Sequence, residues 1–250
     1  MEKIYSRTTT IQEDKVSGFC PGCMHSTVIK LMGEALDELG VVDKAVLITG
    51  IGCCGLDMDY IAYDTITSPH GRACAVATGI KRPNPDTLVI TIQGDGDLAS
   101  IGLAETMSAA NRGENISVIF INNGIYGMTG GQMAPTTLVG QKTTTSPHGR
   151  DEAWCGAPIK MAEMLSEVPG SYYIERCAVN NNGNIIKTKK AIKKAMQYEL
   201  DGKGFCMIEV LSTCPTNWGL NPVEAMKWLE DNMIPYYPLG VKKDKGADNK

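Results

Sequence analysis

Two short polar segments have the residue types that bind a diphosphate and a divalent cation. One is the Gly-Asp-Gly-Asp segment at 94–97, and the other is the Asn-Asn-Gly-Ile-Tyr-Gly segment at 122–127. Glycines let backbone N–H groups approach a phosphate, and a following helix N-terminus adds favourable electrostatics. A carboxylate beside a phosphate is unfavourable unless a cation such as Mg²⁺ lies between them. Either segment alone is more typical of a tight turn, but their separation by one helix and one strand favours a shared ligand site.

Cysteines supply a second group of residues with chemical potential. Cys20 and Cys23 form a C-x-x-C pair, which by itself fits a zinc half-site, a redox pair or an iron–sulfur half-site. Cys53 and Cys54 follow the first predicted strand, and Cys214 follows the last, so thiolates could converge near the diphosphate site. Cys74, Cys177 and Cys206 lie within predicted elements and are interpreted as buried small hydrophobic residues. Cys155 has no assigned role.

The segments between these residues predict the elements that position them. Continuous apolar runs are typical of strands covered on both faces, at 45–49, 87–92, 116–121, 171–177 and 205–211. Helical periodicity lies between them, at 26–39, 98–112 and 184–200. This alternation predicts an α/β fold with a doubly wound, mostly parallel sheet and helices on both faces. We expect one domain over 1–250, with an N-terminal arm at 1–18 and a mobile tail at 240–250.

Composition excludes several other classes. The formal net charge of −4 gives no reason to expect a nucleic-acid partner. A membrane span needs about 18 consecutive apolar residues, which this sequence does not contain. The polar start of the chain predicts a cytoplasmic location, where cysteines favour metal binding or redox chemistry over disulfides.

Gly-Asp-Gly followed at this interval by Asn-Asn resembles the signature of thiamine-diphosphate enzymes. The resemblance implies that Asp95, Asn123 and the backbone carbonyl of Ile125 bind Mg²⁺. His70, in a His-Gly-Arg-Ala stretch, is expected against the cofactor as a catalytic residue. The cofactor-binding residues implied in this way are Ile51, Gly52, Cys53, Cys54, His70, Gly94, Gly96, Asp97, Gly127 and Met128.

Over residues 19–239 the chain is similar to the separate β subunits of 2-oxoacid:ferredoxin oxidoreductases. The similarity lies in C-P-G-C, G-I-G-C, H-G-R-A, A-T-G-I-K, G-D-G-D, N-N-G-I-Y-G-M-T-G-G-Q and T-C-P-T-N-W-G. It implies one [4Fe–4S] cluster on Cys20, Cys23, Cys53 and Cys214. Cys54 departs from the family pattern, in which a small residue such as Ser is usual, so the third ligand could be Cys53 or Cys54.

The resemblance also implies the reaction and the partners. A 2-oxoacid is oxidatively decarboxylated to acyl-CoA and CO₂, and electrons pass through the cluster to ferredoxin. Thiamine diphosphate, Mg²⁺ and coenzyme A are the implied small molecules. The activating glutamate is expected from an α subunit with the pyrimidine-binding domain. Further γ and ferredoxin-like δ subunits complete the expected hetero-oligomer, and the chain alone is expected to be inactive.

Substrate choice and two rival functions stay open at this level. M-A-P-T-T-L-V-G and M-I-P-Y-Y-P-L-G resemble subunits that act on branched-chain acids such as 2-oxoisovalerate, with 2-oxoglutarate as the alternative. Arg72, Lys81 and Arg150 are the candidates to bind a second carboxylate, while His148 in the repeated Ser-Pro-His-Gly-Arg stretch has no assigned role. The rivals are a cluster-free thiamine-diphosphate decarboxylase subunit and a zinc-stabilised binding module.

Overall fold

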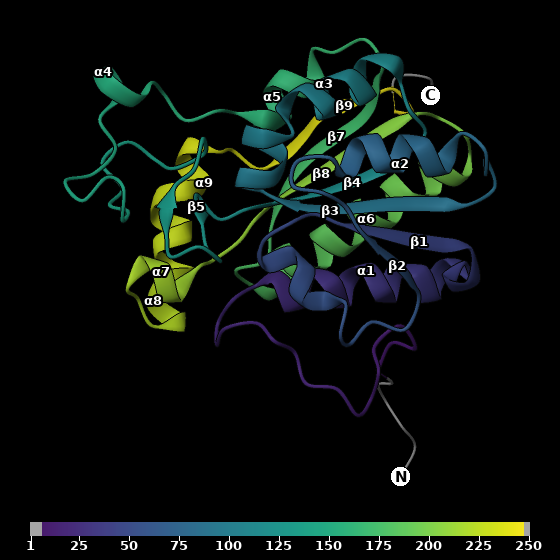
Figure 1. Cartoon of the computed structure of the whole chain (residues 1–250), viewed down its shortest axis with the longest axis horizontal. Helices are drawn as coiled ribbons and strands as arrows, with labels where there is room; N and C mark the ends of the chain where they lie inside the picture. Colours follow the sequence, from purple (N-terminus) through teal and green to yellow (C-terminus); the bar gives the residue numbers. More distant parts are fainter. Residues whose placement is uncertain (1–6, 248–250) are drawn as a thin grey trace.

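The central element is a seven-stranded sheet, and the computed structural model describes residues 7–247 (Figure 1). The strand order is β2-β1-β3-β4-β8-β7-β9, and only the β7–β9 pair is antiparallel. The strands are β1 (Ala45–Thr49), β2 (Asp64–Thr67), β3 (Leu88–Gly94), β4 (Ser117–Asn122), β7 (Ser171–Ala178), β8 (Phe205–Leu211) and β9 (Gly240–Asp244). The predicted α/β class with a mostly parallel sheet is confirmed.

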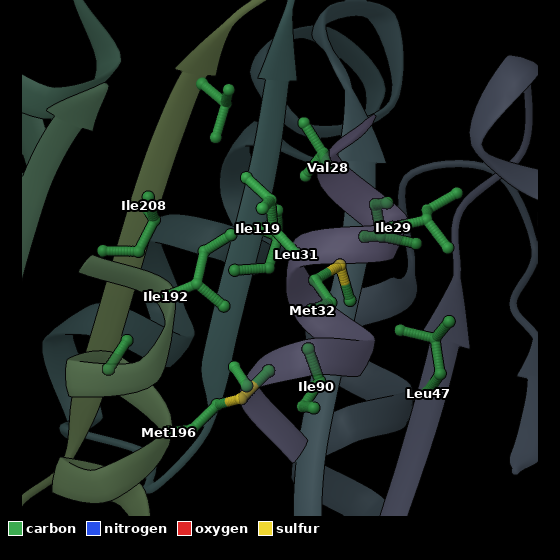
Figure 2. Close-up of a cluster of buried hydrophobic side chains, with 14 of the residues drawn as sticks. Val28, Ile29, Leu31, Met32, Leu47, Ile90, Ile119, Ile192, Met196 and Ile208 are labelled. Carbon is green, nitrogen blue, oxygen red and sulfur yellow. The ribbon is translucent and has the colours of Figure 1, made fainter. Parts of the chain in front are cut away.

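Helices cover both faces of this sheet (Figure 1). One face packs against α1 (His25–Leu39) and α6 (Asn182–Leu200), and the other against α2 (Ala73–Lys81), α3 (Leu103–Arg112) and α5 (Met161–Ser166). Figure 2 shows the first of these cores, in which Met32 of α1 and Ile192 of α6 lie over sheet residues such as Ile90, Ile119 and Ile208. In the strands between the two edges, neighbouring residues alternate between the two cores, as Ile90 and Val89 do, so these strands are apolar on both faces.

Short elements gather beyond the carboxyl ends of the strands. They are β5 (Ile125–Tyr126), β6 (Gln132–Met133), α4 (Glu152–Cys155), α7 (Pro215–Trp218), α8 (Pro222–Trp228), α9 (Ile234–Tyr236) and the tight or wide turns η2 (Cys53–Asp57), η3 (Asp97–Ile101) and η4 (Leu229–Met233). A further tight turn, η1 (Val42–Lys44), leads into the amino end of β1. Helices α7 to α9 share a third apolar cluster with Leu138 and Leu211, whereas α4 lies on an arm that extends from the body (Figure 1).

The five predicted strands are present with ends shifted by at most two residues, but the two edge strands and α2 were missed. Strand β2 is short and largely exposed, so it lacks the apolar run of a buried strand. The predicted helix 98–112 is divided, because the wide turn η3 ends at Gly102 before α3 begins. A Cβ at Gly102 would lie 2.4 Å from the carbonyl oxygen of Gly71, so the division brings the 69–72 loop close to this helix.

The predicted mobile tail from residue 240 is wrong for 240–244, which form the edge strand β9. The Lys243 ammonium donates hydrogen bonds to the carbonyls of Ser166 and Val168, which ties this strand to the body. Residues 248–250 lie outside the described residues. Of the predicted N-terminal arm, residues 1–6 also lie outside, and Ile11 in the described part forms a bridge with Ile61. None of the helices within 7–247 is long and apolar enough to cross a membrane.

Candidate active site

One pocket lies where the parallel strands β1, β3, β4 and β8 end. These strands are paired in register, so the segments that follow them meet at a single edge of the sheet. The pocket is lined by residues from three such segments and from the 69–72 loop: Ile51, Gly52, Cys53, Cys54, His70, Gly94, Asp95, Gly96, Asp97, Asn123, Ile125, Tyr126, Gly127, Met128 and Thr129. The tertiary structure therefore brings together every residue predicted to contact thiamine diphosphate or Mg²⁺, and adds Tyr126 and Thr129.

Asp95 is the buried carboxylate at the floor of this pocket. Its Oδ2 accepts hydrogen bonds from the Gly124 N–H and the Thr136 hydroxyl, each at 2.6 Å. Burial raises the pKa of Asp95 to about 6, although the hydrogen bond from Thr136 lowers it. Thr136 was missed, because nothing in its own segment signals that it reaches a residue 41 positions away.

The oxygen donors around Asp95 fit a hard divalent cation. Asn123 and Ile125 line the same pocket, and Asn123 Oδ1 accepts a hydrogen bond of 3.3 Å from the Ile125 N–H. Within 7–247, no three His, Cys, Asp or Glu side chains come close enough to hold one metal ion. A Mg²⁺ site here would therefore depend on amide and backbone carbonyl oxygens beside one carboxylate, which is a donor set that suits Mg²⁺.

Gly96 lies under an aromatic ring that leaves no room for a side chain. A Cβ at this position would lie 1.9 Å from Cε1 of Tyr126. The helical segment begins here, directly after β3, so its first backbone N–H groups lie at the pocket. This combination of glycine and helix start suits an anion such as a diphosphate.

Asp97, predicted to line the diphosphate, lines the pocket, and its carboxylate also accepts hydrogen bonds from the protein itself. Oδ1 accepts hydrogen bonds from the N–H groups of Ile51 (3.1 Å) and Gly71 (2.8 Å). Nδ1 of His70 lies 2.6 Å from the same oxygen, and Nε2 of Gln93 donates to Oδ2 at 2.6 Å. Asp97 therefore joins the loops that follow β1 and β2 to the end of β3.

The same contact orients His70. Because a carboxylate only accepts hydrogen bonds, the short contact assigns the ring proton to Nδ1. The side chain remains one-third exposed and lines the pocket. Nε2, on the other side of the ring, is the atom that a bound molecule could reach.

The four predicted thiols lie near one another beside this pocket, although no three of them are close enough to hold a single metal ion. Burial raises the pKa of Cys23 to about 12, with smaller contributions from the neighbouring thiols of Cys214, Cys53 and Cys20. Burial likewise raises the pKa of Cys53 to about 11, again with contributions from Cys214 and Cys20. A Cβ on Gly127 would lie 3.3 Å from Cys53 Sγ and 3.5 Å from Cys214 Sγ, so the pocket loop passes directly beside two of the thiols.

Cys54 points away from that group. Its side chain is buried in the core under α1, and burial with the nearby Asp57 carboxylate raises the pKa of its thiol. This placement favours Cys53 over Cys54 as the third member of the quartet. Cys74, Cys177 and Cys206 are buried as predicted, and Cys155 lies half-buried on α4.

Two of the three candidates for a second substrate carboxylate are already engaged, so the structure contradicts them. The Lys81 ammonium donates to the Thr87 carbonyl (2.6 Å) and pairs with Glu199 (3.1 Å), before the start of β3. The Arg150 guanidinium donates to six backbone carbonyls around 134–137 and 155–157. Arg72 is paired with Glu105 but remains half-exposed.

Comparison with known proteins agrees with this geometry. Residues 50–210 match the family model described as thiamine pyrophosphate enzyme, C-terminal TPP binding domain. The chain belongs to that family of thiamine pyrophosphate enzymes. Within it, the chain belongs with the subunits of 2-oxoacid:ferredoxin oxidoreductases, as the following relatives indicate.

Ketoisovalerate oxidoreductase subunit VorA of Methanothermobacter thermautotrophicus is 46% identical over 230 residues, covering 92% of this chain and 48% of the relative. The chain thus spans about half the length of that relative. 2-Oxoglutarate synthase subunit KorB of Archaeoglobus fulgidus is 38% identical over 214 residues, covering 86% of this chain and 76% of the relative. A solved structure of 2-oxoglutarate:ferredoxin oxidoreductase from Magnetococcus marinus, with 2-oxoglutarate, coenzyme A and succinyl-CoA bound, is similar to this chain with a TM-score of 0.75 at 28% sequence identity. The match covers 88% of this chain and 71% of the chain in that structure.

Proposed function

We propose that this chain is the thiamine-diphosphate-binding subunit of a ferredoxin-dependent, CoA-acylating 2-oxoacid oxidoreductase. The observation that carries the proposal is the shared Gly127 loop. Gly127 lines the pocket that holds the diphosphate motif, and a Cβ on it would lie 3.3 Å from Cys53 Sγ and 3.5 Å from Cys214 Sγ. Decarboxylation and electron removal would thus occur beside one backbone segment.

The residues of the pocket would hold the cofactor in a defined way. Asp95, Asn123 and the Ile125 carbonyl would bind Mg²⁺, and the helix start at Gly96 would face the diphosphate. Bound thiamine diphosphate supplies a carbon nucleophile that also accepts the electrons released by decarboxylation. His70, oriented by Asp97, would place Nε2 toward the reacting end of the pocket.

The four thiols would hold a [4Fe–4S] cluster. The pKa values of these thiols are raised because the thiolates formed by losing a proton would be buried and would repel one another. Iron offsets that cost by supplying positive charge. Such a cluster supplies one-electron transfer toward ferredoxin. The chain's own contribution is to place Cys20, Cys23, Cys53 and Cys214 within reach of the pocket.

We propose a branched-chain acid such as 2-oxoisovalerate as the substrate, with 2-oxoglutarate as the alternative. Ile51 and Met128 line it with 41% and 51% of their surfaces exposed, which gives apolar contacts for an aliphatic side chain. Lys81 and Arg150 are engaged elsewhere, which leaves Arg72 as the candidate for a second carboxylate. In the reconstituted complex we expect a higher kcat/KM for 2-oxoisovalerate, and a preference for 2-oxoglutarate would reverse this assignment.

Partner subunits would complete the site. No glutamate is found among the described residues that line the pocket, so the group that activates the pyrimidine ring would come from an α subunit. Exposed apolar side chains in the pocket and on the elements next to its segments would form the contact with that subunit: Ile51 and Met128 in the pocket, Met58 beside η2, Ile66 on β2 and Ile101 in η3. The γ and δ subunits, ferredoxin and a cytoplasmic location complete the proposal.

Iron, acid-labile sulfide and the visible spectrum of anaerobically purified chain test this function. We expect about four irons per wild-type chain, loss of iron in Cys214→Ser and retention in Cys155→Ser, a half-exposed control thiol. If the wild-type protein binds thiamine diphosphate without iron, the cluster-free decarboxylase is the better assignment. If it binds zinc and no thiamine diphosphate, it is a zinc-stabilised module.

A further inference from the structure

The short helix α7 contacts three parts of the candidate site at once. It begins directly after Cys214, and Nδ2 of Asn217 donates hydrogen bonds to Cys214 Sγ (3.3 Å) and to the Gly127 carbonyl (3.0 Å). The adjacent Trp218 donates from Nε1 to the Asn123 carbonyl at 3.2 Å. One turn of helix therefore joins a predicted cluster ligand to two points of the pocket segment that follows β4.

The surroundings of Asn217 fit an amide closely. Gly131 has a positive φ of 85°, and a Cβ there would lie 2.9 Å from Asn217 Oδ1. The loop from Gly127 to Gly131 thus passes around the amide, with the Gly131 N–H bonded to the Tyr126 carbonyl at 2.9 Å. The NH₂ group has two protons, and the thiol and the carbonyl use one each.

We propose that Asn217 is a positioning residue that stabilises the reduced cluster through its N–H···S bond to Cys214 and fixes the Gly127 loop beside it. The inference rests on the proposed function, because it needs a cluster on Cys214. A hydrogen bond to sulfur stabilises the extra negative charge of the reduced state, which raises the reduction potential. The same amide keeps the pocket loop at a constant distance from the thiol.

The test compares full-length wild-type chain, Asn217→Leu, Asn217→Asp and Asn221→Asp, purified anaerobically, by an EPR-monitored redox titration. Asn217→Leu keeps the size and removes both N–H donors, and Asn217→Asp removes them while keeping the shape. Asn221→Asp is the control, because Asp caps α8 as Asn does and adds a charge nearby. We expect the cluster in Asn217→Leu to be about tenfold harder to reduce, which is about 59 mV for one electron.

A second measurement covers the case in which the variants lose iron. Because the Asn217 backbone N–H also bonds the Cys214 thiol, the label is placed in the side-chain amide alone. Pulsed EPR of reduced wild-type chain with ¹⁵N in its asparagine side-chain amides should detect a nitrogen coupled to the cluster, and no such coupling overturns the inference. An unchanged potential in Asn217→Leu with full iron also overturns it, while the proposed function stands. Absence of iron from wild-type chain overturns both.

Discussion

At the scale of single residues, Asp97 shows how one buried carboxylate can hold the loops of a site together. Its oxygens accept hydrogen bonds from Ile51, Gly71, His70 and Gln93, so it joins the pocket loops to the end of β3. A Cβ on Gly50 would lie 2.5 Å from Asp97 Oδ2, so position 50 has room only for glycine. The geometry of the pocket therefore depends on Asp97, which the Gly-Asp-Gly-Asp motif alone assigns to diphosphate binding.

Asp97→Asn should lower the free energy of unfolding by about 2–4 kcal/mol. An amide has one acceptor oxygen, so its NH₂ group must face either Gln93 or the donors of the two loops. Urea unfolding of the chain measures the change. Asp86→Asn, an exposed control, should alter stability by less than about 0.5 kcal/mol. Equal effects of the two substitutions would contradict the hydrogen-bond assignment.

Asp57 is a second buried carboxylate, and it predicts a pH dependence of stability. Burial raises its pKa to about 7, although nearby backbone N–H groups lower it, and neither oxygen makes a hydrogen bond of normal geometry. Because the folded-state pKa lies above the usual value of 3.8, the stability from protonated Asp57 is complete below about pH 4 and is lost as the pH rises through about 7.

Asp57→Asn should therefore be more stable than the wild type by an amount that grows between pH 4 and pH 8, up to a limit of roughly 4 kcal/mol. The free energy of unfolding of both proteins, measured across this range, gives the difference directly and cancels other titrating groups. Asp59→Asn, an exposed neighbour, should show no such growth. A constant difference between Asp57→Asn and wild type would contradict the raised pKa.

At the scale of elements, the described part of the N-terminal arm packs on α1 through a glycine and a carboxylate. A Cβ on Gly33 would lie 2.0 Å from the Thr10 hydroxyl. Asp37, one turn later, accepts hydrogen bonds from Thr8 Oγ1 (2.6 Å) and the Thr9 N–H (2.9 Å). The helix thus presents a smooth surface where the arm crosses it and a hydrogen-bond acceptor beside it.

Gly33→Ala should displace the arm and destabilise the chain by about 1–3 kcal/mol despite the better helix propensity of alanine. Hydrogen exchange should accelerate at the amides of Thr9 and Gln12, which bond to Asp37 and to the Tyr60 carbonyl. Gly79→Ala in α2 is the matched control, because nothing lies within 4 Å of its Cβ. That change should stabilise by about 0.5–1 kcal/mol.

At the scale of the whole molecule, the two edges of the sheet differ in what lies near them. Strand β2 carries the exposed Ile66, and the adjacent Thr67 contacts Met58. Ile66 and Met58 are two of the exposed apolar residues proposed to contact the α subunit. Strand β9, at the other edge, carries exposed Val241. The proposed α-subunit contact therefore predicts different effects of a new charge at the two edges.

Ile66→Glu should weaken association with the α subunit at least tenfold, because it places a charge in an apolar contact. Val241→Glu, with a similar exposed apolar residue on the opposite edge, should leave association unchanged. Sedimentation of the mixed subunits measures the affinity, and unfolding of each chain alone checks that both variants fold. Equal losses of affinity would place the contact elsewhere.

The predicted parts of the fold are those with a strong local signal. Buried strands such as β4 and β8 are apolar on both faces, and α6 carries apolar residues at helical spacing, so their sequences alone are sufficient. The edge strands β2 and β9 are polar or charged and gain their structure from a neighbour's backbone, as β9 does from β7. A local pattern cannot predict such a pairing.

The sequence by itself determined which residues share the pocket, because the ends of parallel strands must meet at one edge and the motifs follow those ends. Only the tertiary structure decided how they are used. It turned Asp97 toward the protein, separated Cys54 from Cys53, and engaged Lys81 and Arg150 with distant partners. The physical reason is that side-chain direction and hydrogen-bond partners depend on neighbours brought near by folding, and no sequence spacing specifies them.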